Sequence, residues 1–206
     1  MVINMRLYTV DLRKIDLNGE WRRLMSSERM AKIDRLKPGK SKLASIGAEL
    51  ALIQAVKDNI SGAEIPLRCG YMPGGKPYLL EYPDFFYNIS HSGDYAVCAA
   101  ADSPIGVDIQ KLRKPDMRIA ERRFTEDEYN YICKDEDRNF FRIWTRKESI
   151  LKADGAGITI PLNSFSVMED TVILNNREYR FTEAEPPEEG YALCICQEIN
   201  YSMKSE

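Results

Sequence analysis

The sequence predicts an α+β protein of two similar lobes, related by pseudo-twofold symmetry, in which each lobe packs a small antiparallel sheet against helices. Short runs of alternating apolar and polar residues, separated by turn residues, are typical of antiparallel strands. Two longer segments with apolar residues at helical spacing lie one in each half of the chain. A Gly, Tyr-Ala, aliphatic, Cys pattern at 93–98 returns at 190–194. This repeat places the expected lobes at residues 1–102 and 103–206.

The first half begins with strand-forming residues and continues with two helices. Ser26 is a typical helix N-cap, and Pro38 with Gly39 ends the helix that it starts. The expected elements are a strand at 2–11, helices at 26–36 and 43–58, a loop rich in glycine and proline at 68–80, and strands at 85–90 and 95–100. A tight turn at 91–94 is expected to join the last two strands.

The second half opens on a strand, becomes helical and closes with short strands. Gly155 and Gly157 follow the longer helix, where glycine commonly ends a helix. The expected elements are a strand at 105–110, helices at 119–132 and 136–154, and strands at 165–168, 171–175, 178–184 and 191–197. The acidic run 183–189 contains two prolines and is expected to be a surface loop.

Charge is distributed unevenly along the 206 residues, whose formal net charge is −3. Residues 1–42 hold eleven Lys and Arg against five Asp and Glu, a net of +6, so the remainder carries −9. A nucleic-acid-binding domain is usually basic throughout, so we expect no nucleic acid partner. A local basic segment suits a site for a small polyanion, and a solvated helix face would give the same charge pattern.

Several bulk features favour a cytoplasmic protein without a membrane segment, and a chain of two lobes is expected to work as a monomer. No stretch approaches the roughly 18 apolar residues of a membrane-spanning helix, and the first residues lack the apolar core of a signal peptide. The five cysteines are odd in number and fit no zinc spacing, so neither a disulfide framework nor a structural zinc site is expected. Cys194 and Cys196 lie in a strand-like run and are expected to be small buried side chains.

The strand at 105–110 places a carboxylate and an amide on one face. Side chains alternate along a strand, so Asp108 and Gln110 lie opposite the three aliphatic residues of the run, roughly 7 Å from each other. Two oxygen donors at this spacing suit a hard cation such as Mg²⁺. An exposed polar face on an edge strand would give the same pattern.

A further acidic residue lies on the helix at 136–154. Trp144, Glu148 and Lys152 follow one another at four-residue spacing, so they form one stripe of the helix. The charged pair is either an exposed ion pair that stabilises the helix slightly, or a metal ligand and a phosphate contact that extend from a buried aromatic face into a cleft. The helix by itself leaves both interpretations open.

Two other segments carry groups suited to phosphate. Ser90 and His91, the only histidine of the chain, stand beside a turn, where hydroxyls, an imidazole and backbone amides can bind phosphate oxygens. A capped turn with a surface histidine is the alternative. Gly74-Gly75-Lys76-Pro77 presents one lysine on a glycine turn but lacks the GxxxxGK[ST] pattern of a P-loop. The absence of a GxSxG motif argues against a serine hydrolase.

These segments follow one another as GKP at 75–77, NISHSG at 88–93, GVDI at 106–109, WTRKESILKADGAG at 144–157 and PLNSFSV at 161–167. Together they resemble the Sfp-type 4′-phosphopantetheinyl transferases. The resemblance covers about residues 26–168 and implies two lobes with coenzyme A between them. It also implies an enzyme that moves the 4′-phosphopantetheine arm of coenzyme A to a serine of an acyl or peptidyl carrier protein. The by-product would be 3′,5′-ADP. The reaction would require Mg²⁺, which Mn²⁺ could replace.

The resemblance assigns roles by position. The residues that it places on Mg²⁺ are Asp108, Gln110 and Glu148, and the catalytic residues are Glu148, Lys152 and Asp108. The residues expected to bind coenzyme A are Arg29, Lys32, Lys42, Gly75, Lys76, Pro77, Ser90, His91 and Lys152. His91 would lie near the 3′-phosphate, and Lys40 is the alternative to Lys42.

Carrier protein docking is expected near residues 111–132. The basic residues there, which would meet an acidic helix of the carrier, are Arg113, Lys114, Arg118, Arg122 and Arg123. The apolar residues that could contribute contacts are Met117, Ile119, Phe124, Tyr129 and Tyr131. Most apolar residues of such a segment belong to a core, so this assignment rests mainly on charge.

One position departs from the family pattern, because Gln110 stands where the family usually has glutamate. An amide oxygen can bind a metal, directly or through water, but it adds no charge and cannot accept a proton. The role of general base would then fall to Glu148, Lys152 or a water molecule. A homologue that binds coenzyme A without transferring the arm is therefore one alternative function, and a non-enzymatic interaction module with a basic face is another.

Overall fold

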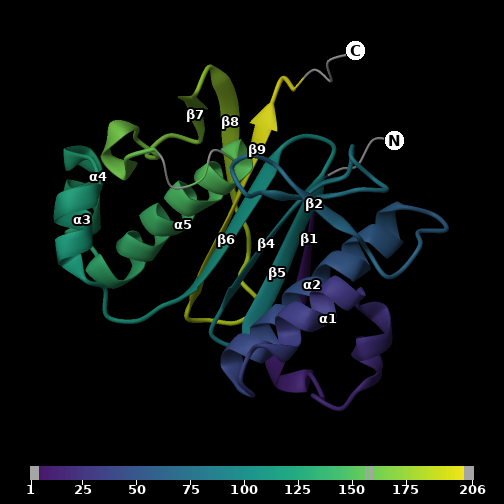
Figure 1. Ribbon diagram of the computed structural model, residues 1–206. Coiled ribbons are helices and arrows are strands. Elements are labelled where there is room, and N and C mark those ends of the chain that lie inside the picture. The colour runs from purple at the N-terminus through teal and green to yellow at the C-terminus, as the bar shows by residue number, and fades with distance from the viewer. Residues whose placement is uncertain (1–4, 156, 158–159, 202–206) are drawn as a thin grey trace.

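The computed structural model describes residues 5–155, 157 and 160–201, and it has the α+β architecture that the sequence predicts (Figure 1). Strands fill the middle of the molecule, and helices flank them on two sides. The helices of the N-terminal side are α1 (Ser27–Asp34) and α2 (Lys40–Asn59). Those of the C-terminal side are α3 (Met117–Arg123), α4 (Glu126–Ile132) and α5 (Glu136–Asp154).

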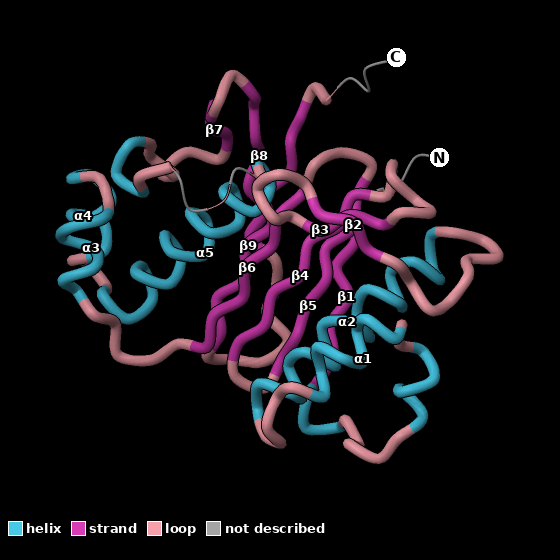
Figure 2. Tube along the Cα trace, viewed as in Figure 1, coloured by secondary structure: helices cyan, strands magenta, loops and turns pink. Residues whose placement is uncertain are grey.

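The first half of the chain forms a three-stranded antiparallel sheet with α2 packed against it (Figure 2). The strand order is β1 (Arg6–Asp11), β5 (Tyr95–Ala101) and β4 (Phe86–Ser92). Short 3₁₀ helices at Leu12–Lys14 and Glu20–Leu24 lead from β1 to α1. The Oγ of Ser26 accepts a hydrogen bond of 3.2 Å from the Arg29 amide, which confirms the predicted cap. Residues 2–4 of the predicted strand lie outside the described residues.

The second half forms a four-stranded antiparallel sheet, and α5 packs against its first two strands. The strand order is β6 (Ile105–Lys111), β9 (Tyr191–Ile199), β8 (Arg177–Glu183) and β7 (Thr171–Leu174). Helix α5 begins after Asp135, whose carboxylate caps the Arg138 amide, and it ends at Gly155 with a left-handed φ of 78°. Glycine adopts this conformation without steric cost, so the predicted stop is confirmed. Ala156, part of the same predicted stop, lies outside the described residues.

The two sheets face each other, with the apolar side of β6 between them. The three aliphatic residues of β6 are fully buried and pack in one cluster with Val97 and Ala99 of β5. The predicted apolar face of this strand is therefore confirmed. Tyr95 and Tyr191, the tyrosines of the repeated pattern, meet edge to face with ring centroids 5.3 Å apart.

Two expectations for the first half are wrong in detail. The segment 68–80 is not a loop throughout, because β2 (Cys69–Tyr71) and β3 (Pro77–Leu79) pair as a hairpin around its glycine turn. Strand β4 continues through Ser92, so the predicted turn at 91–94 shrinks to Gly93 and Asp94. Gly93 has a φ of 58°, which lets the chain reverse within two residues.

Two expectations for the second half are also wrong. The segment 119–132 is not one helix, because Thr125 starts a new helix there. Its hydroxyl accepts a hydrogen bond from the Glu128 amide, and the Glu128 carboxylate accepts one from the Thr125 amide, which is a capping box. Residues 165–168 form no strand. The Val167 amide donates to the Glu128 carboxylate at 2.8 Å, so a side chain takes the place of a neighbouring strand. A 3₁₀ turn at Leu162–Ser164 precedes this segment.

The cysteines and the helices can be compared with what the sequence predicts for burial, disulfides and membrane segments. Cys194 and Cys196 are fully buried in the core of the second half, as predicted. All five cysteines are free thiols, of which Cys133 is exposed. Among the described residues, no helix is both long and apolar enough to cross a membrane.

Candidate active site

Helix α5 lies directly against β6, and a glycine permits this close approach. A Cβ atom at Gly106 would lie 2.0 Å from the backbone oxygen of Ser149, so any other residue would push the helix away. Asp108 follows two residues later and therefore faces the same side of the strand. Lys152 occupies the last turn of α5, where a cation is favoured by the helix dipole. Because α5 lies so close to β6, the Asp108 carboxylate on the strand contacts the Lys152 ammonium on the helix.

Asp108 is the centre of the hydrogen-bonded group that results. Its side chain is almost fully buried, with 3% exposed. Its Oδ1 accepts hydrogen bonds from Lys152 Nζ at 2.6 Å and from Ser90 Oγ at 2.9 Å. Its Oδ2 accepts one from Gln110 Nε2 at 3.0 Å. Four residues that the sequence singled out are thus in direct contact.

Glu148 lies one helical turn before Lys152 and is half-buried. Burial raises the pKa of its carboxyl group, the negative charge of Asp108 raises it further, and the Lys152 ammonium offsets part of this rise. Within the described residues, no hydrogen bond or ion pair engages the Glu148 carboxylate. The Asp108 charge thus opposes ionisation of Glu148, and a cation bound between the two side chains would relieve this opposition.

The donors present fit a magnesium ion. Carboxylate and amide oxygens are hard ligands, and Mg²⁺ usually takes only one or two protein carboxylates and keeps several waters. The described residues gather no group of three or more His, Cys, Asp and Glu side chains suited to a metal. An ion here would therefore depend on Asp108 and Glu148, with Gln110 or water completing its shell.

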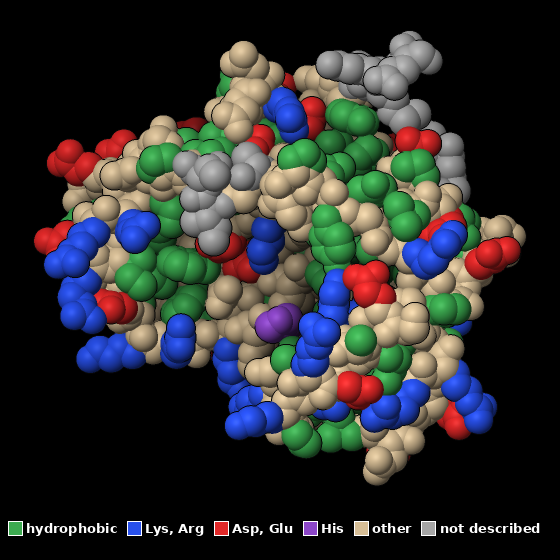
Figure 3. All heavy atoms as spheres, viewed as in Figure 1, with side chains coloured by type: hydrophobic (Ala, Val, Ile, Leu, Met, Phe, Trp, Pro, Cys, Tyr) green, Lys and Arg blue, Asp and Glu red, His purple; other side chains and the backbone are tan. Residues whose placement is uncertain are grey.

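His91 follows Ser90 on β4, so it points to the other face of that strand and is exposed. Its partly enclosed surroundings lower the pKa of the imidazole, the positive charge of Lys152 lowers it further, and Asp108 offsets part of the fall. The neutral form is therefore favoured at neutral pH. Figure 3 shows the histidine, in purple, beside a hollow of the surface with lysine and arginine side chains nearby.

Two of the predicted cationic residues of the N-terminal segment line a cavity that is separate from the group around Asp108. Arg29 and Lys32 line this cavity of about 220 Å³ together with Glu49, Tyr71 and Pro77. Arg29 Nε lies 2.9 Å from a Glu49 oxygen, at ion-pair distance but without hydrogen-bond geometry. Lys32 donates a hydrogen bond to the Tyr71 hydroxyl at 2.5 Å and lies over its ring. Lys32 Nζ also lies 2.8 Å from Glu28, so both cations already have a carboxylate partner with which an anionic ligand would compete.

The other predicted lysines point elsewhere. Lys42 Nζ lies 3.5 Å from Asp34 and does not line the cavity of Arg29 and Lys32. Lys76 Nζ donates hydrogen bonds of 3.0 and 2.9 Å to the backbone oxygens of Ile105 and Ala153. Burial lowers the pKa of Lys76 to about 8. This ammonium is directed at the protein backbone. The coenzyme A contact expected of Lys76 stays a prediction.

Two clusters thus hold most of the predicted residues, one around Asp108 and one at the cavity of Arg29 and Lys32, while Lys42 and Lys76 lie apart from both. In the part of the chain that the structure describes, no hydrogen bond or ion pair joins Arg29, Lys32 or Lys42 to the group around Asp108. The sequence assigned no individual role to Asn88 and Ser92, although both contact β6. The signal that could have identified them is the N-x-S-x-S alternation, which places three polar side chains on one face of a strand.

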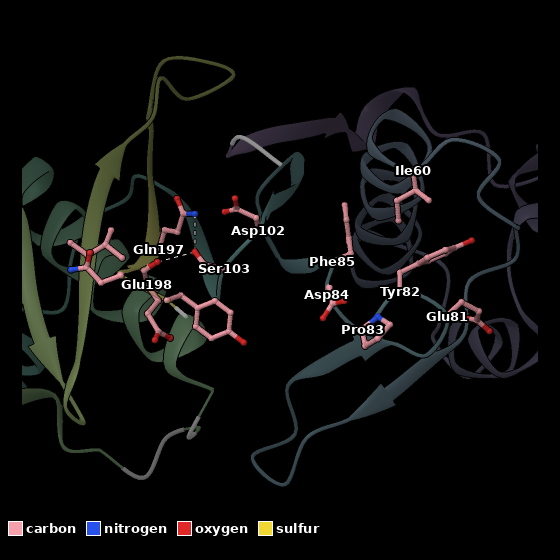
Figure 4. A pocket seen from close by; sticks show the side chains of 13 residues that line it. Ile60, Glu81, Tyr82, Pro83, Asp84, Phe85, Asp102, Ser103, Gln197 and Glu198 are labelled. Atoms are coloured by element: carbon pink, nitrogen blue, oxygen red, sulfur yellow. Dashed lines mark hydrogen bonds between the residues drawn. The ribbon is translucent and has the colours of Figure 1, made fainter. Parts of the chain in front are cut away.

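A larger cavity of about 840 Å³ lies elsewhere between the two halves (Figure 4). Ser103, Gln197 and Glu198 come from one side of it, and Tyr82 and Pro83 from the other. None of the residues predicted for the site lines this cavity. The candidate active site is therefore identified by its chemistry and not by volume.

Comparison with known proteins bears on the same segments. Residues 104–196 match the family model described as the 4′-phosphopantetheinyl transferase superfamily. This match includes Asp108, Gln110, Glu148 and Lys152. The matched segment is just under half of the chain. The chain is also similar to curated transferases of the Sfp type.

Three of these relatives illustrate the similarity. The 4′-phosphopantetheinyl transferase Sfp of Bacillus subtilis (strain 168) is 43% identical over 97 residues, which are 45% of this chain and 43% of the relative. A 4′-phosphopantetheinyl transferase of Bacillus subtilis is 37% identical over 137 residues, which are 62% and 61%. The 4′-phosphopantetheinyl transferase gsp of Aneurinibacillus migulanus is 37% identical over 131 residues, which are 59% and 54%. The chain spans about half of the length of the relatives it matches.

Proposed function

We propose that this protein moves the 4′-phosphopantetheine arm of coenzyme A to a serine of an acyl or peptidyl carrier protein and releases 3′,5′-ADP. The observation that carries the proposal is the contact of Asp108 with Lys152 at 2.6 Å, with Glu148 one turn away. These side chains come from two separate motifs and meet on one side of β6. Similarity to proteins named 4′-phosphopantetheinyl transferase supports the same reaction.

The reaction requires charge stabilisation more than covalent participation of the protein. The carrier serine oxygen forms a bond to the phosphorus that bears the pantetheine arm, the bond from this phosphorus to the oxygen of the leaving 3′,5′-ADP breaks, and the serine proton passes to a base. Asp108, Glu148 and Gln110 would hold Mg²⁺, which neutralises charge on the pyrophosphate. Lys152 would stabilise the charge that develops on the transferred group. Glu148, Lys152 and a water molecule are the candidates for the base.

The two-lobed organisation expected from the sequence is part of the proposal, with residues 1–102 and 103–206 as the lobes. Strand order supports it, because β1-β5-β4 in one half corresponds to β6-β9-β8 in the other. The register agrees as well: Asp11 lies opposite Tyr95, and Lys111 lies opposite Tyr191. Coenzyme A would then lie between the lobes, with its 3′-phosphate toward the cationic residues of the first. A cytoplasmic monomer that binds no nucleic acid stays a prediction from sequence.

One experiment separates the proposed function from its alternatives. The protein is incubated with coenzyme A, Mg²⁺ and a generic apo carrier protein, and the carrier is then weighed by intact mass spectrometry. A gain of one phosphopantetheine arm on the carrier is the expected result. Coenzyme A binding without any gain would favour the homologue that no longer transfers the arm. The absence of both binding and Mg²⁺ dependence would favour a non-enzymatic module.

Replacing Gln110 by glutamate tests the metal site. The Gln110→Glu variant is expected to reach half-maximal transfer at a lower Mg²⁺ concentration, because a third carboxylate adds negative charge beside Asp108. A Mg²⁺ titration of the initial transfer rate measures this shift, and Gln197→Glu, on β9 and away from the site, is the matched control. A titration that does not move relative to the unmodified protein would exclude a ligand role for position 110.

A basic surface beside the site is proposed to receive the carrier protein. A cavity of about 650 Å³ is lined by Asp116, Arg118, Ile119, Arg122, Arg123, Trp144, Glu148 and Leu162. Glu148 thus connects the catalytic group to a cavity with three arginines, whose charge complements an acidic helix. Phe124, one of the apolar residues expected here, is instead buried in the core, with 5% exposed.

Charge reversal on this surface should weaken binding of the carrier protein and leave binding of coenzyme A unchanged. The Arg122→Glu/Arg123→Glu variant is expected to raise the KM for an acidic carrier at least about tenfold, because like charges then face each other. Calorimetric binding of coenzyme A should not change. Lys57→Glu, an exposed reversal on α2, is the control for a charge reversal away from this surface. An equal rise in KM in the control would exclude this surface as the docking site.

A further inference from the structure

The two halves of the chain close a pair of neighbouring strands in the same way. In the first half, the first amide after β1 donates a hydrogen bond of 2.8 Å to the Asp94 oxygen, directly before Tyr95. In the second half, the first amide after β6 donates one of 2.8 Å to the Gly190 oxygen, directly before Tyr191. Each tyrosine therefore begins its strand, β5 or β9, at a matching point. Because their rings meet edge to face, with centroids 5.3 Å apart, both points lie on the boundary between the halves.

Tyr191 reaches from the second half to the turn between β4 and β5 in the first half. Its hydroxyl accepts a hydrogen bond of 3.0 Å from the Asp94 amide and donates one of 3.4 Å to the Asp94 carboxylate. Lys111 Nζ donates to the same carboxylate at 2.8 Å and lies 5.5 Å from the centroid of the Tyr191 ring. Gly93 leaves room for this approach, because a Cβ atom there would lie 2.4 Å from the Tyr191 hydroxyl oxygen. Side chains of the second half thus hold the turn of the first.

Tyr95 makes the reciprocal contact, from the first half to the loop before β9 in the second. Its hydroxyl donates a hydrogen bond of 2.7 Å to Glu188 Oε2 and accepts one of 2.7 Å from Arg13. The Arg13 guanidinium lies 3.1 Å from the Glu188 carboxylate and 5.2 Å from the centroid of the Tyr95 ring. Two hydrogen bonds of 2.9 Å to Asp11 fix this guanidinium. Each tyrosine hydroxyl therefore bonds an acidic residue in the segment before the other tyrosine, and a cation joins each pair.

The two tyrosines are buried, whereas the cations beside them are half exposed. Tyr95 and Tyr191 are only 6% and 7% exposed. The side chains of Arg13 and Lys111 reach solvent, and ion pairs of such exposed groups contribute little because water and salt screen them. Hydrogen bonds weaken steeply when their geometry is lost, so a relative shift of the halves would break the bonds of both hydroxyls. These bonds therefore favour one arrangement of the halves.

We propose that Tyr95 and Tyr191 form a reciprocal clasp, which holds the two halves in one relative arrangement and so positions the residues of both halves for coenzyme A before it binds. Both tyrosines are positioning residues, and neither has a direct role in the chemistry. A protein whose halves are already arranged needs no binding free energy to order them, which strengthens the binding of a ligand that contacts both. This effect on coenzyme A rests on the proposed function, whereas the contacts of the clasp do not depend on any activity.

The test compares the Tyr95→Phe/Tyr191→Phe double variant, which removes both hydroxyls and keeps both rings, with Tyr8→Phe. The Tyr8 hydroxyl accepts from Asn59 at 2.7 Å within the first half, so its removal leaves the clasp intact. The double variant should raise the dissociation constant for coenzyme A, measured by calorimetry without carrier, about tenfold, an effect of the size of one lost hydrogen bond. Its kcat at saturating coenzyme A should stay within about threefold, because the bound ligand then orders the halves. Tyr8→Phe should change neither value beyond that factor.

An unchanged dissociation constant in the double variant would overturn the positioning role, and so would an equal rise in Tyr8→Phe. A fall in kcat as large as the rise in the dissociation constant would also overturn it, since general damage to the fold lowers both. Amide hydrogen exchange tests the clasp without any ligand. The Asp94 amide should exchange faster in Tyr191→Phe and keep its protection in Tyr95→Phe, and unchanged exchange in Tyr191→Phe would refute the contact. If the unmodified protein binds no coenzyme A, the proposed function fails while the exchange data still decide the clasp.

Discussion

Replacement of Lys152 by methionine is expected to lower the rate of arm transfer by about 10²- to 10³-fold, the loss typical of removing one group that stabilises charge in the transition state. The methionine keeps the length of the side chain and its packing on α5. It removes the ammonium that lies 2.6 Å from Asp108 Oδ1 and 3.2 Å from Ser90 Oγ. Initial rates of carrier modification by intact mass measure the effect, and Lys57→Met, an exposed change on α2, is the control.

The pKa of His91, the single histidine, gives an independent measure of the Lys152 charge. The partly enclosed surroundings of His91 and the Lys152 ammonium both hold the pKa of its imidazole below the ordinary value of 6.5, whereas Asp108 raises it. Lys152→Met should therefore raise the pKa of His91, and Asp108→Asn should lower it further. Because the chain has one histidine, its imidazole signals in a pH titration by nuclear magnetic resonance are unambiguous. An unmoved pKa in both variants would mean that these charges do not act on His91.

The same shift has a consequence for stability. A histidine whose pKa is lower in the folded state binds fewer protons there than in the unfolded state, so acid favours unfolding. The stability that neutral His91 contributes is present above its ordinary pKa of 6.5 and is lost as pH falls through the unfolded pKa toward the folded one. Lys152→Met raises the folded pKa, so this part of the acid sensitivity should become smaller.

Local periodicity was enough to predict the parts of the site that depend on one element. Alternation along β6 predicted which face carries Asp108, and four-residue spacing predicted that Glu148 and Lys152 share one side of α5. Both follow from the geometry of a single strand or helix. The glycine at position 106 then decides how close these two elements come, and that contact is visible only in three dimensions.

The contacts of Ser90 and Lys76 could not be predicted in this way. Each depends on β4 and the β2–β3 hairpin lying against β6, an arrangement between segments that are distant in sequence. The sequence around Ser90 and Lys76 indicated none of these protein partners, and the phosphate contacts expected of both residues stay predictions. The break between α3 and α4 is a different case, since the Thr-x-x-Glu signature of a capping box was present at 125–128.

A second large effect is expected at Lys147, the residue before Glu148, which lies on a fully buried side of α5. Its ammonium lies 2.8 Å from Glu128 Oε1, and neither side chain is exposed. It also donates to the backbone oxygens of Leu162 and Phe165. Burial lowers the pKa of Lys147, and the Glu128 carboxylate offsets part of that fall. This pair ties the start of α4 and the segment after α5 to the helix that carries the catalytic residues.

Lys147→Met should lower the free energy of unfolding by about 3–5 kcal/mol, because it leaves the Glu128 carboxylate buried without its countercharge. Urea unfolding followed by circular dichroism measures the loss. The Glu128→Gln/Lys147→Met double variant should be more stable than Lys147→Met alone, since the amide carries no charge and its oxygen can still accept from the Val167 amide. Arg23→Met, which breaks an exposed pair with Glu20, should leave the midpoint unchanged.

A Lys147→Met variant no less stable than this control would show that the buried pair does not hold α4 to α5. A double variant less stable than Lys147→Met would mean that Glu128 acts mainly through its bonds to the Thr125 and Val167 amides.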